Sequence, residues 1–135
     1  MPTFSDAEKA AMQERAREQR EFKKLSGEDQ VRRKVSEMSP AEQKIALGFH
    51  DLVLSIDPNL KPQTWYGMPA YYLDGKVVCF FQPGSKFESR YSTIGFQETA
   101  KLDDGDLFAT SFAVIKFTPE VKERIAGLVR KAVGK

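Results

Sequence analysis

Residues 65–81 read WYGMPAYYLDGKVVCFF, and this stretch decides the fold of the chain. Within it, residues 71–73 and 76–81 are apolar, β-prone segments that flank the dipeptide Asp74-Gly75. An Asp-Gly pair between two such segments is a strong local signal for a two-residue type I′ hairpin. The sequence therefore predicts that these two segments pair as antiparallel strands.

Further β signals follow the hairpin. Gln82-Pro83-Gly84-Ser85 has the composition of a turn, and residues 87–96 alternate between the two faces of a strand. Residues 97–102 fit a helical turn that Asp103-Asp104-Gly105 closes, and residues 107–117 are apolar enough for one more strand. Together these segments predict an antiparallel meander of about four to five strands.

Helix signals lie on both sides of the meander. Ser39-Pro40-Ala41-Glu42 combines an N-cap, a proline at the first helical position and a glutamate at N3. The apolar residues after it have the spacing of one buried helix face, and they are Ile45, Phe49, Leu52, Val53 and Ile56. Asp57-Pro58 ends this helix. Thr118-Pro119-Glu120 begins a last helix with the same apolar spacing, which runs to Ala132.

The first 37 residues are the most highly charged part of the chain, with nine Lys or Arg and eight Asp or Glu. Ser5-Asp6-Ala7-Glu8 predicts a helix start, and Ser26 with Asp29 predicts a second one. The apolar stripe of the first helix is thin. Residues 1–37 are therefore interpreted as a charged helical arm exposed to solvent, and an arm that docks onto another protein is the alternative. Residues 38–135 are then an α+β two-layer sandwich with a C-terminal helix.

Composition narrows the classes of function. The chain has 135 residues and a net charge of +2, from 21 basic and 19 acidic residues. Such a balance does not favour nucleic acid or an anionic membrane as a partner. A single cysteine fits a reducing compartment, and the N-terminal residues have no signal-peptide pattern. A cytoplasmic protein is expected.

Several motifs, in order along residues 37–133, resemble the YdhG-like proteins, a family of small bacterial proteins with a domain of unknown function. They are WYGMPAY at 65–71, GKVVCFF at 75–81, Lys86-Phe87, Arg90-Tyr91, Gly95-Phe96, LDDG at 102–105 and TSFA at 110–113. The superfamily also contains YjbR-like and bacterial frataxin-like proteins. The resemblance implies a frataxin-like α+β fold. For some relatives it also implies a role as an iron chaperone, which binds iron weakly and delivers it to iron–sulfur or haem assembly proteins. It implies no catalytic residues.

The residues themselves give a weak metal signal. His50 and Cys79 are the only residues of their kinds, and they lie in unrelated positions. We expect His50 to be a surface or half-buried structural histidine, and Cys79 to be an inert core thiol. Iron binding of the frataxin type relies on clustered carboxylates, but here Arg and Lys are interleaved with the early Glu residues. The remaining metal candidates are Asp103, Asp104 and Asp106, for which a plain turn is the competing interpretation.

An aromatic cleft is the second candidate site. Its walls would be Trp65, Tyr66, Met68 and Tyr72, and its cationic donors Lys86 and Arg90, which suits an anionic or planar small molecule or a protein partner. The alternative is that the aromatic residues only cover the core. No nucleophile–base pair, phosphate loop or acid pair is recognisable, so we expect a non-enzymatic protein.

Overall fold

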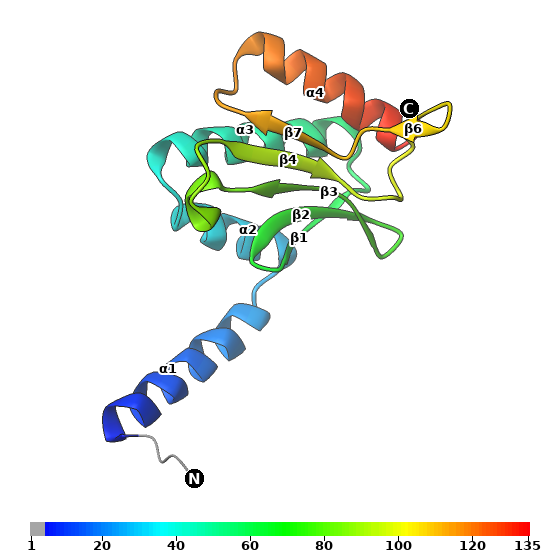
Figure 1. Ribbon diagram of the computed structural model, residues 1–135. Helices are drawn as coiled ribbons and strands as arrows, with labels where there is room; N and C mark the ends of the chain where they lie inside the picture. The colour runs from blue at the N-terminus through cyan, green and yellow to red at the C-terminus, as the bar shows by residue number, and fades with distance from the viewer. Residues whose placement is uncertain (1–4) are drawn as a thin grey trace.

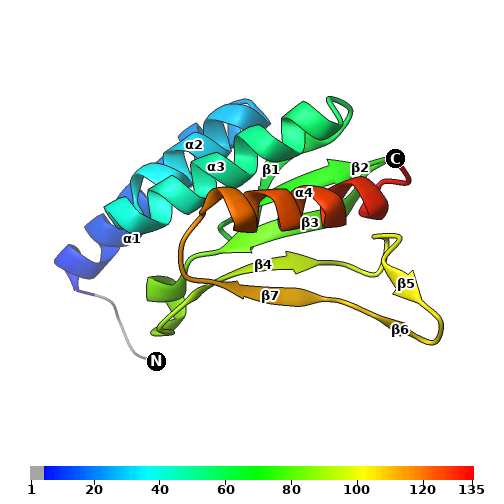
Figure 2. The same cartoon turned by 90° about the horizontal axis from the view of Figure 1, so that it is seen from above.

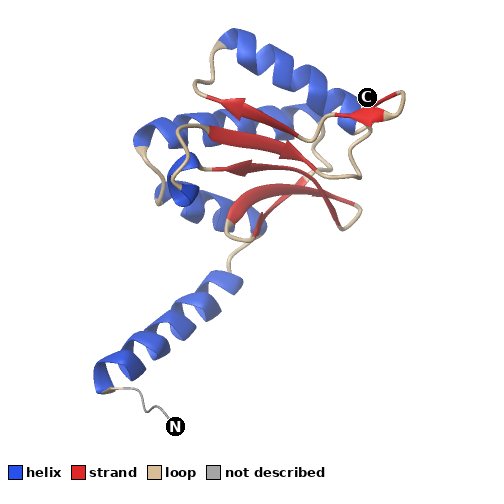
Figure 3. Cartoon of the chain, in the orientation of Figure 1, coloured by secondary structure: helices blue, strands red, loops and turns tan. Residues whose placement is uncertain are grey.

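The computed structural model describes residues 5–135, apart from the side chain of Phe87, and has an α+β fold (Figures 1 and 3). Its helices are α1 (Asp6–Lys23), α2 (Gly27–Ser36), α3 (Pro40–Ile56) and α4 (Pro119–Ala132), with a 3₁₀ helix η1 (Gly84–Phe87). Its strands are β1 (Lys61–Trp65), β2 (Met68–Leu73), β3 (Lys76–Gln82), β4 (Ser92–Phe96), β5 (Asp103–Asp104), β6 (Leu107–Phe108) and β7 (Ser111–Val114). The predicted fold class is confirmed.

Four hydroxyl side chains begin the four α-helices, as the sequence predicts. Each accepts a hydrogen bond from the backbone N–H three residues on, and the caps are Ser5, Ser26, Ser39 and Thr118. Ser39 and Glu42 form the full capping box, because the Glu42 side chain also accepts from the Ser39 N–H at 3.1 Å. Asp57, which precedes a proline, takes an extended conformation and ends α3.

The main sheet is antiparallel with the strand order β1-β2-β3-β4-β7, and β5 pairs with β6 in a separate hairpin. The turn between β2 and β3 is Asp74-Gly75, where φ is +53° and +79° as a type I′ turn requires. This confirms the hairpin predicted from the sequence. A bulge follows Tyr71, so the register between β2 and β3 shifts at this point.

Three details of the predicted meander are wrong. Strand β1 was not predicted, and it forms a first hairpin with β2 across Tyr66-Gly67. The predicted strand 87–96 begins only at Ser92, because the chain first turns through η1 and a left-handed Glu88 at φ +53°. The predicted strand 107–117 is two short strands, β6 and β7, separated at residues 109–110.

The helices α2, α3 and α4 lie on one face of the main sheet, and the core fills the space between the two layers (Figure 2). Phe49 and Val53 of α3 are fully buried against Tyr71 and Phe81 of the sheet. We call the opposite face of the main sheet, which no helix within residues 5–135 covers, the open face. Helix α1 extends beyond the β1 side of the sheet (Figure 1) and has no buried residue, whereas α2, from the predicted arm, is anchored in the core by Val31 and Val35.

Within residues 5–135, no helix has both the length and the apolar character needed to cross a membrane.

Candidate functional site

Strand alternation decides which side chains reach the open face. Cys79 and Phe81 are fully buried in the core, so Phe80 between them points to the open face. Phe80 pairs with Ala70 on one neighbouring strand and with Gly95 on the other. The same alternation places Trp65, Met68 and Tyr72 on the open face. Met68 is buried there, and Trp65 and Tyr72 are half-buried.

An aromatic ridge crosses the open face from β1 to β4. The ring centroids of Trp65 and Phe80 are 5.3 Å apart, and those of Trp65 and Tyr66 are 5.0 Å apart. The ring of Phe80 lies directly over Gly95, since a Cβ on Gly95 would be 2.2 Å from its Cζ atom. Only glycine leaves room for the ring, which in turn shields the glycine backbone from water. We call Trp65 and Phe80 the aromatic ridge.

Beside the ridge, the open face has small side chains and almost no charge. Its positions on β4 and β7 hold small residues, namely Thr93, Gly95, Ser111 and Ala113. Across the five strands of the main sheet, all of them described, Lys61 is the one charged residue whose register position falls on this face. In a chain with 30% charged residues, such a face is a local departure from the rest of the surface.

The structure brings together most of the residues predicted for an aromatic cleft. Tyr66, on the turn between β1 and β2, is 80% exposed, and Lys86 of η1 donates to its backbone carbonyl at 2.9 Å. Trp65, Met68 and Tyr72 lie on the adjoining strands. Arg90 instead lines a separate hollow of about 240 Å³ near the N-terminus of α3.

Glu42 also lines the hollow beside Arg90. It is buried, and both oxygens of its carboxylate accept hydrogen bonds. It accepts from the Ser85 N–H at 2.9 Å and from the Ser85 hydroxyl at 2.8 Å. Burial alone would raise the pKa of Glu42, but the hydrogen bonds from Ser85 and Ser39 outweigh it and lower the pKa. Glu42 therefore holds the turn before β4 against the start of α3.

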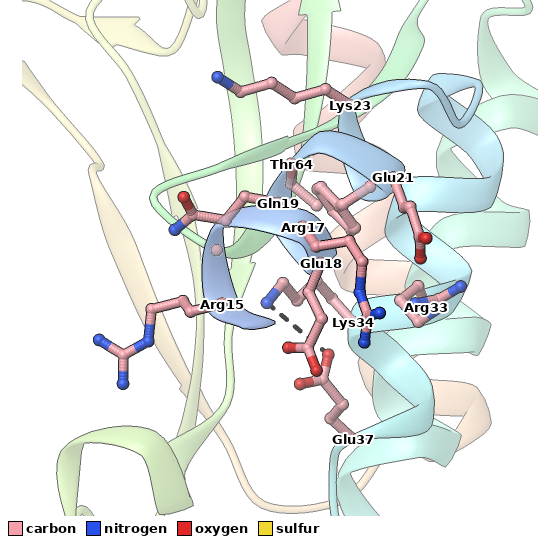
Figure 4. Close-up of a pocket in the computed structure, with 12 residues that line it drawn as sticks. Arg15, Arg17, Glu18, Gln19, Glu21, Lys23, Arg33, Lys34, Glu37 and Thr64 are labelled. Carbon is pink, nitrogen blue, oxygen red and sulfur yellow. Dashed lines mark ion pairs between the residues drawn. The ribbon is translucent and has the colours of Figure 1, made fainter. Parts of the chain in front are cut away.

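A larger groove, about 920 Å³, lies between α1, α2 and the β1–β2 turn (Figure 4). Its walls carry charges of both signs, and Glu18 of α1 and Glu37, the residue after α2, point toward each other across it. Lys34 pairs with Glu37 at 3.7 Å. None of the candidate site residues from the sequence lines this groove.

Gln30 of α2 forms the base of the α1–α2 junction and is buried. Its side-chain NH₂ donates to the carbonyls of Phe22 at 3.4 Å and Leu25 at 3.3 Å, and its oxygen accepts from the Thr64 hydroxyl at 3.1 Å. One side chain thus satisfies carbonyls at the end of α1 and joins them to β1.

The three predicted metal ligands lie on the β5–β6 hairpin. Asp103 and Asp104 form β5, Asp106 lies in the turn between β5 and β6, and all three are exposed. In the described part of the chain, no three His, Cys, Asp or Glu side chains are grouped so that they could hold a metal ion.

His50 is fully buried, so the prediction of a surface or half-buried residue is wrong. Its Nδ1 is 2.9 Å from the Tyr71 hydroxyl, and its Nε2 is 2.8 Å from Oε2 of Glu28. Glu28 also accepts from Arg32 at 2.8 Å. Burial would raise the pKa of Glu28, but hydrogen bonds and charges from His50 and Arg32 outweigh it and lower the pKa. The network joins α2, α3 and β2.

Cys79 is a core thiol, as expected from its apolar strand. It is fully buried, and burial raises its pKa, so the reactive thiolate is disfavoured. Burial likewise raises the pKa of Tyr71 well above its ordinary value.

The chain matches no protein-family model, no curated protein sequence and no solved structure. The resemblance to YdhG-like proteins therefore stays a prediction from the sequence motifs.

Proposed function

We propose that this chain is a non-enzymatic protein-binding module whose site is the open face of the sheet around Trp65 and Phe80. The observation that carries the proposal is the aromatic ridge, which lies beside small, uncharged residues on β4 and β7. Aromatic residues and methionine are enriched at the centres of protein interfaces, where charged residues are depleted.

The shape of the face favours a protein over a small molecule. Small ligands bind in concave pockets that enclose most of their surface. The two hollows described above, and a third of about 260 Å³ beside Met38 and Lys86, are lined by other residues than Trp65, Met68, Tyr72 and Phe80. Aromatic rings beside a row of small residues instead suit the apolar side of a partner's helix or sheet.

Two lysines determine the charge that such a partner needs. Lys61 begins β1, and Lys86 lies against Tyr66 just past the other end of the same strand. Strand β1, which carries Trp65, thus has an ammonium group near each end. We assign to this face a partner whose apolar surface is flanked by carboxylates, because opposite charges at the rim direct encounter and orientation.

The surroundings of the usual catalytic residues support a non-enzymatic role. The single histidine is enclosed between Glu28 and Tyr71, and the single cysteine lies in the core. Iron delivery, which the YdhG-like and frataxin-like resemblance implies, stays a prediction, and no feature of the described residues favours it over protein binding.

A photo-crosslinking amino acid at Gln63, an exposed neighbour of Trp65 on the open face, tests the proposal in cells of the source organism. We expect a covalent adduct with one partner, and we expect that adduct to disappear in a Trp65→Ala background but to persist with Phe22→Ala. The purified partner should then shift the emission of Trp65, the only tryptophan.

The same crosslinker at Glu123, exposed on α4, is the matched control. Failure to obtain an adduct at Gln63, or an adduct of equal yield at Glu123, would exclude the open face as the binding site. Circular dichroism of each variant confirms that it is folded.

A further inference from the structure

The Lys and Arg residues of α1 gather on one face of the helix. Residues 6–24 contain six Lys or Arg and five Asp or Glu, so the segment has almost no net charge. At 3.6 residues per turn, however, four of the six basic residues share one stripe, while Glu14, Glu18 and Glu21 lie together on another side. Within α1, which is described in full, Asp6 of the first turn is the one acidic residue on that stripe. We call the stripe the basic face, and its residues are Lys9, Gln13, Arg17, Arg20 and Lys24.

Phe22 determines which side of α1 faces the protein. It is half-buried, and Nζ of Lys34 in α2 lies 5.4 Å from the centre of its ring. The basic face is centred on the opposite side of the helix from Phe22, and all five of its residues are exposed. The acidic Glu18 instead lines the groove between α1 and α2. The basic face therefore points away from the protein, toward solvent.

Most of the charge on the basic face is not neutralised within the molecule. Among the described residues, no carboxylate forms an ion pair with Lys9, Arg20 or Lys24. Arg17 contacts Glu14 at 3.9 Å, but both side chains are 63% exposed, and such surface pairs are weak. The four cations are therefore available to an anionic partner.

The base of α1 is fixed on the sheet. Gln30 joins the end of α1 to β1, as described above. Helix α2 packs against β1 so closely that a Cβ on Gly27 would overlap the carbonyl oxygen of Pro62. From this base α1 extends beyond the β1 side of the sheet (Figure 1), so a large partner can approach the basic face.

The composition of the basic face favours phosphates over other anionic partners. A protein interface has an apolar, desolvated centre, and a helix that lies in a membrane surface inserts an apolar face. The basic face has only Lys, Arg and Gln, which are side chains that bind the phosphate oxygens of nucleic acids. From Lys9 to Lys24 they extend about 22 Å along the helix axis, and this row of cations is complementary to the row of phosphates along a strand.

We infer that the basic face of α1 binds the phosphate backbone of double-stranded nucleic acid without reading its sequence. The near balance of charge over the whole chain does not favour such a partner, but that balance does not show how the charges are sorted on α1. Contacts between cations and phosphates release counterions, so the affinity falls steeply with salt. The site is separate from the open face, which lies on the main sheet and is proposed above for a protein partner.

Fluorescence anisotropy of a short labelled DNA duplex, titrated with the full chain at several salt concentrations, tests the inference. We expect saturable binding, and a plot of log affinity against log salt concentration should have a slope of about −3.5, as four phosphate contacts predict. Lys9→Gln with Arg20→Gln should reduce this slope by about 2 and weaken binding at least about tenfold at low salt. Competition by an unlabelled RNA duplex, which presents the same phosphates, assigns the site to DNA or RNA.

Arg15→Gln with Arg33→Gln is the matched control, because it removes the same charge from exposed residues that line the groove instead. It should change the affinity by less than about threefold. Absence of binding at low salt, equal weakening by the two pairs of substitutions, or equally tight binding to polyglutamate would overturn the inference. Circular dichroism confirms that each variant keeps its helices. Trp65→Ala should leave binding to the duplex unchanged, so this inference and the proposed protein-binding face fail separately.

Discussion

The Tyr71 hydroxyl and Nδ1 of His50 lie 2.9 Å apart inside the core, where both residues are almost completely buried. On its other side the same imidazole contacts Glu28. A histidine held between a hydroxyl and a carboxylate has both ring nitrogens partnered, which a buried imidazole needs.

Replacing His50 should destabilise the protein more than any surface change. We expect His50→Leu to lower the free energy of unfolding by about 2–4 kcal/mol, because it leaves a buried hydroxyl and a carboxylate without their partner. Tyr71→Phe should cost about 1 kcal/mol. Urea denaturation of both variants and of the double variant measures the coupling, and strictly additive effects would contradict the network.

Acid should weaken the link between Glu42 and Ser85. The folded-state pKa of Glu42 is lowered from its ordinary value of 4.5, so its contribution is present above pH 4.5 and is lost as the pH falls through the lower folded value. Glu42→Gln should remove about 1–2 kcal/mol at neutral pH and progressively less in acid. Unfolding free energies measured across this range check the sign; a difference that grows in acid would refute it.

Gly95 is expected to tolerate no side chain. A Cβ there would overlap the Phe80 ring, so Gly95→Ala should cost about 1–3 kcal/mol and should change the emission of the neighbouring Trp65. Phe80→Ala removes the ring that a side chain at position 95 would overlap. In a Phe80→Ala background, Gly95→Ala should therefore lower the free energy of unfolding by less than it does in the wild-type protein. Unaltered stability and fluorescence in Gly95→Ala would show that the ring does not lie over residue 95.

Helix α1 depends on Gln30 more than on its own contacts. It has 18 residues and no buried side chain, and most of the stability of helices in proteins comes from packing of an apolar face. Gln30→Ala should therefore speed trypsin cleavage within α1 while leaving the melting of the core nearly unchanged. Gln43→Ala, which removes a similar side-chain bond from α3 to the Met38 carbonyl, should not speed cleavage within α1.

Ferrous iron separates the role implied by the family resemblance from protein binding. Asp103, Asp104 and Asp106 are exposed on a hairpin, so we expect weak, non-saturating binding that Asp103→Asn with Asp104→Asn changes by less than about twofold. Anaerobic titration followed by NMR line broadening provides the measurement. Saturable binding that the double variant abolishes would establish an iron site on the hairpin.

Local chemistry made much of the fold predictable. The four helix starts depend on a hydroxyl and the N–H three residues later, and the β2–β3 hairpin depends on Asp74-Gly75. Strand β1 was not predictable in this way, because Pro62 weakens the strand signal and Tyr66 adopts a left-handed turn conformation that is rare for an aromatic residue.

The features of the candidate site depend on long-range contacts. His50 meets Glu28, which is 22 residues away on another helix, and no local spacing signals that contact. Phe80 and Phe81 are adjacent and equally apolar, so the sequence could not show which of them faces the helices and which faces the open side. That choice follows only from the register of β3 with its neighbours.

The close approach of Gly27 to the Pro62 carbonyl has a consequence for the β1 edge of the sheet. An uncovered sheet edge offers unpaired N–H and C=O groups to a strand of another chain. Here α2 packs so closely against β1 that this edge leaves no room for such a strand. Glycine at position 27 thereby helps protect the protein against edge-to-edge aggregation.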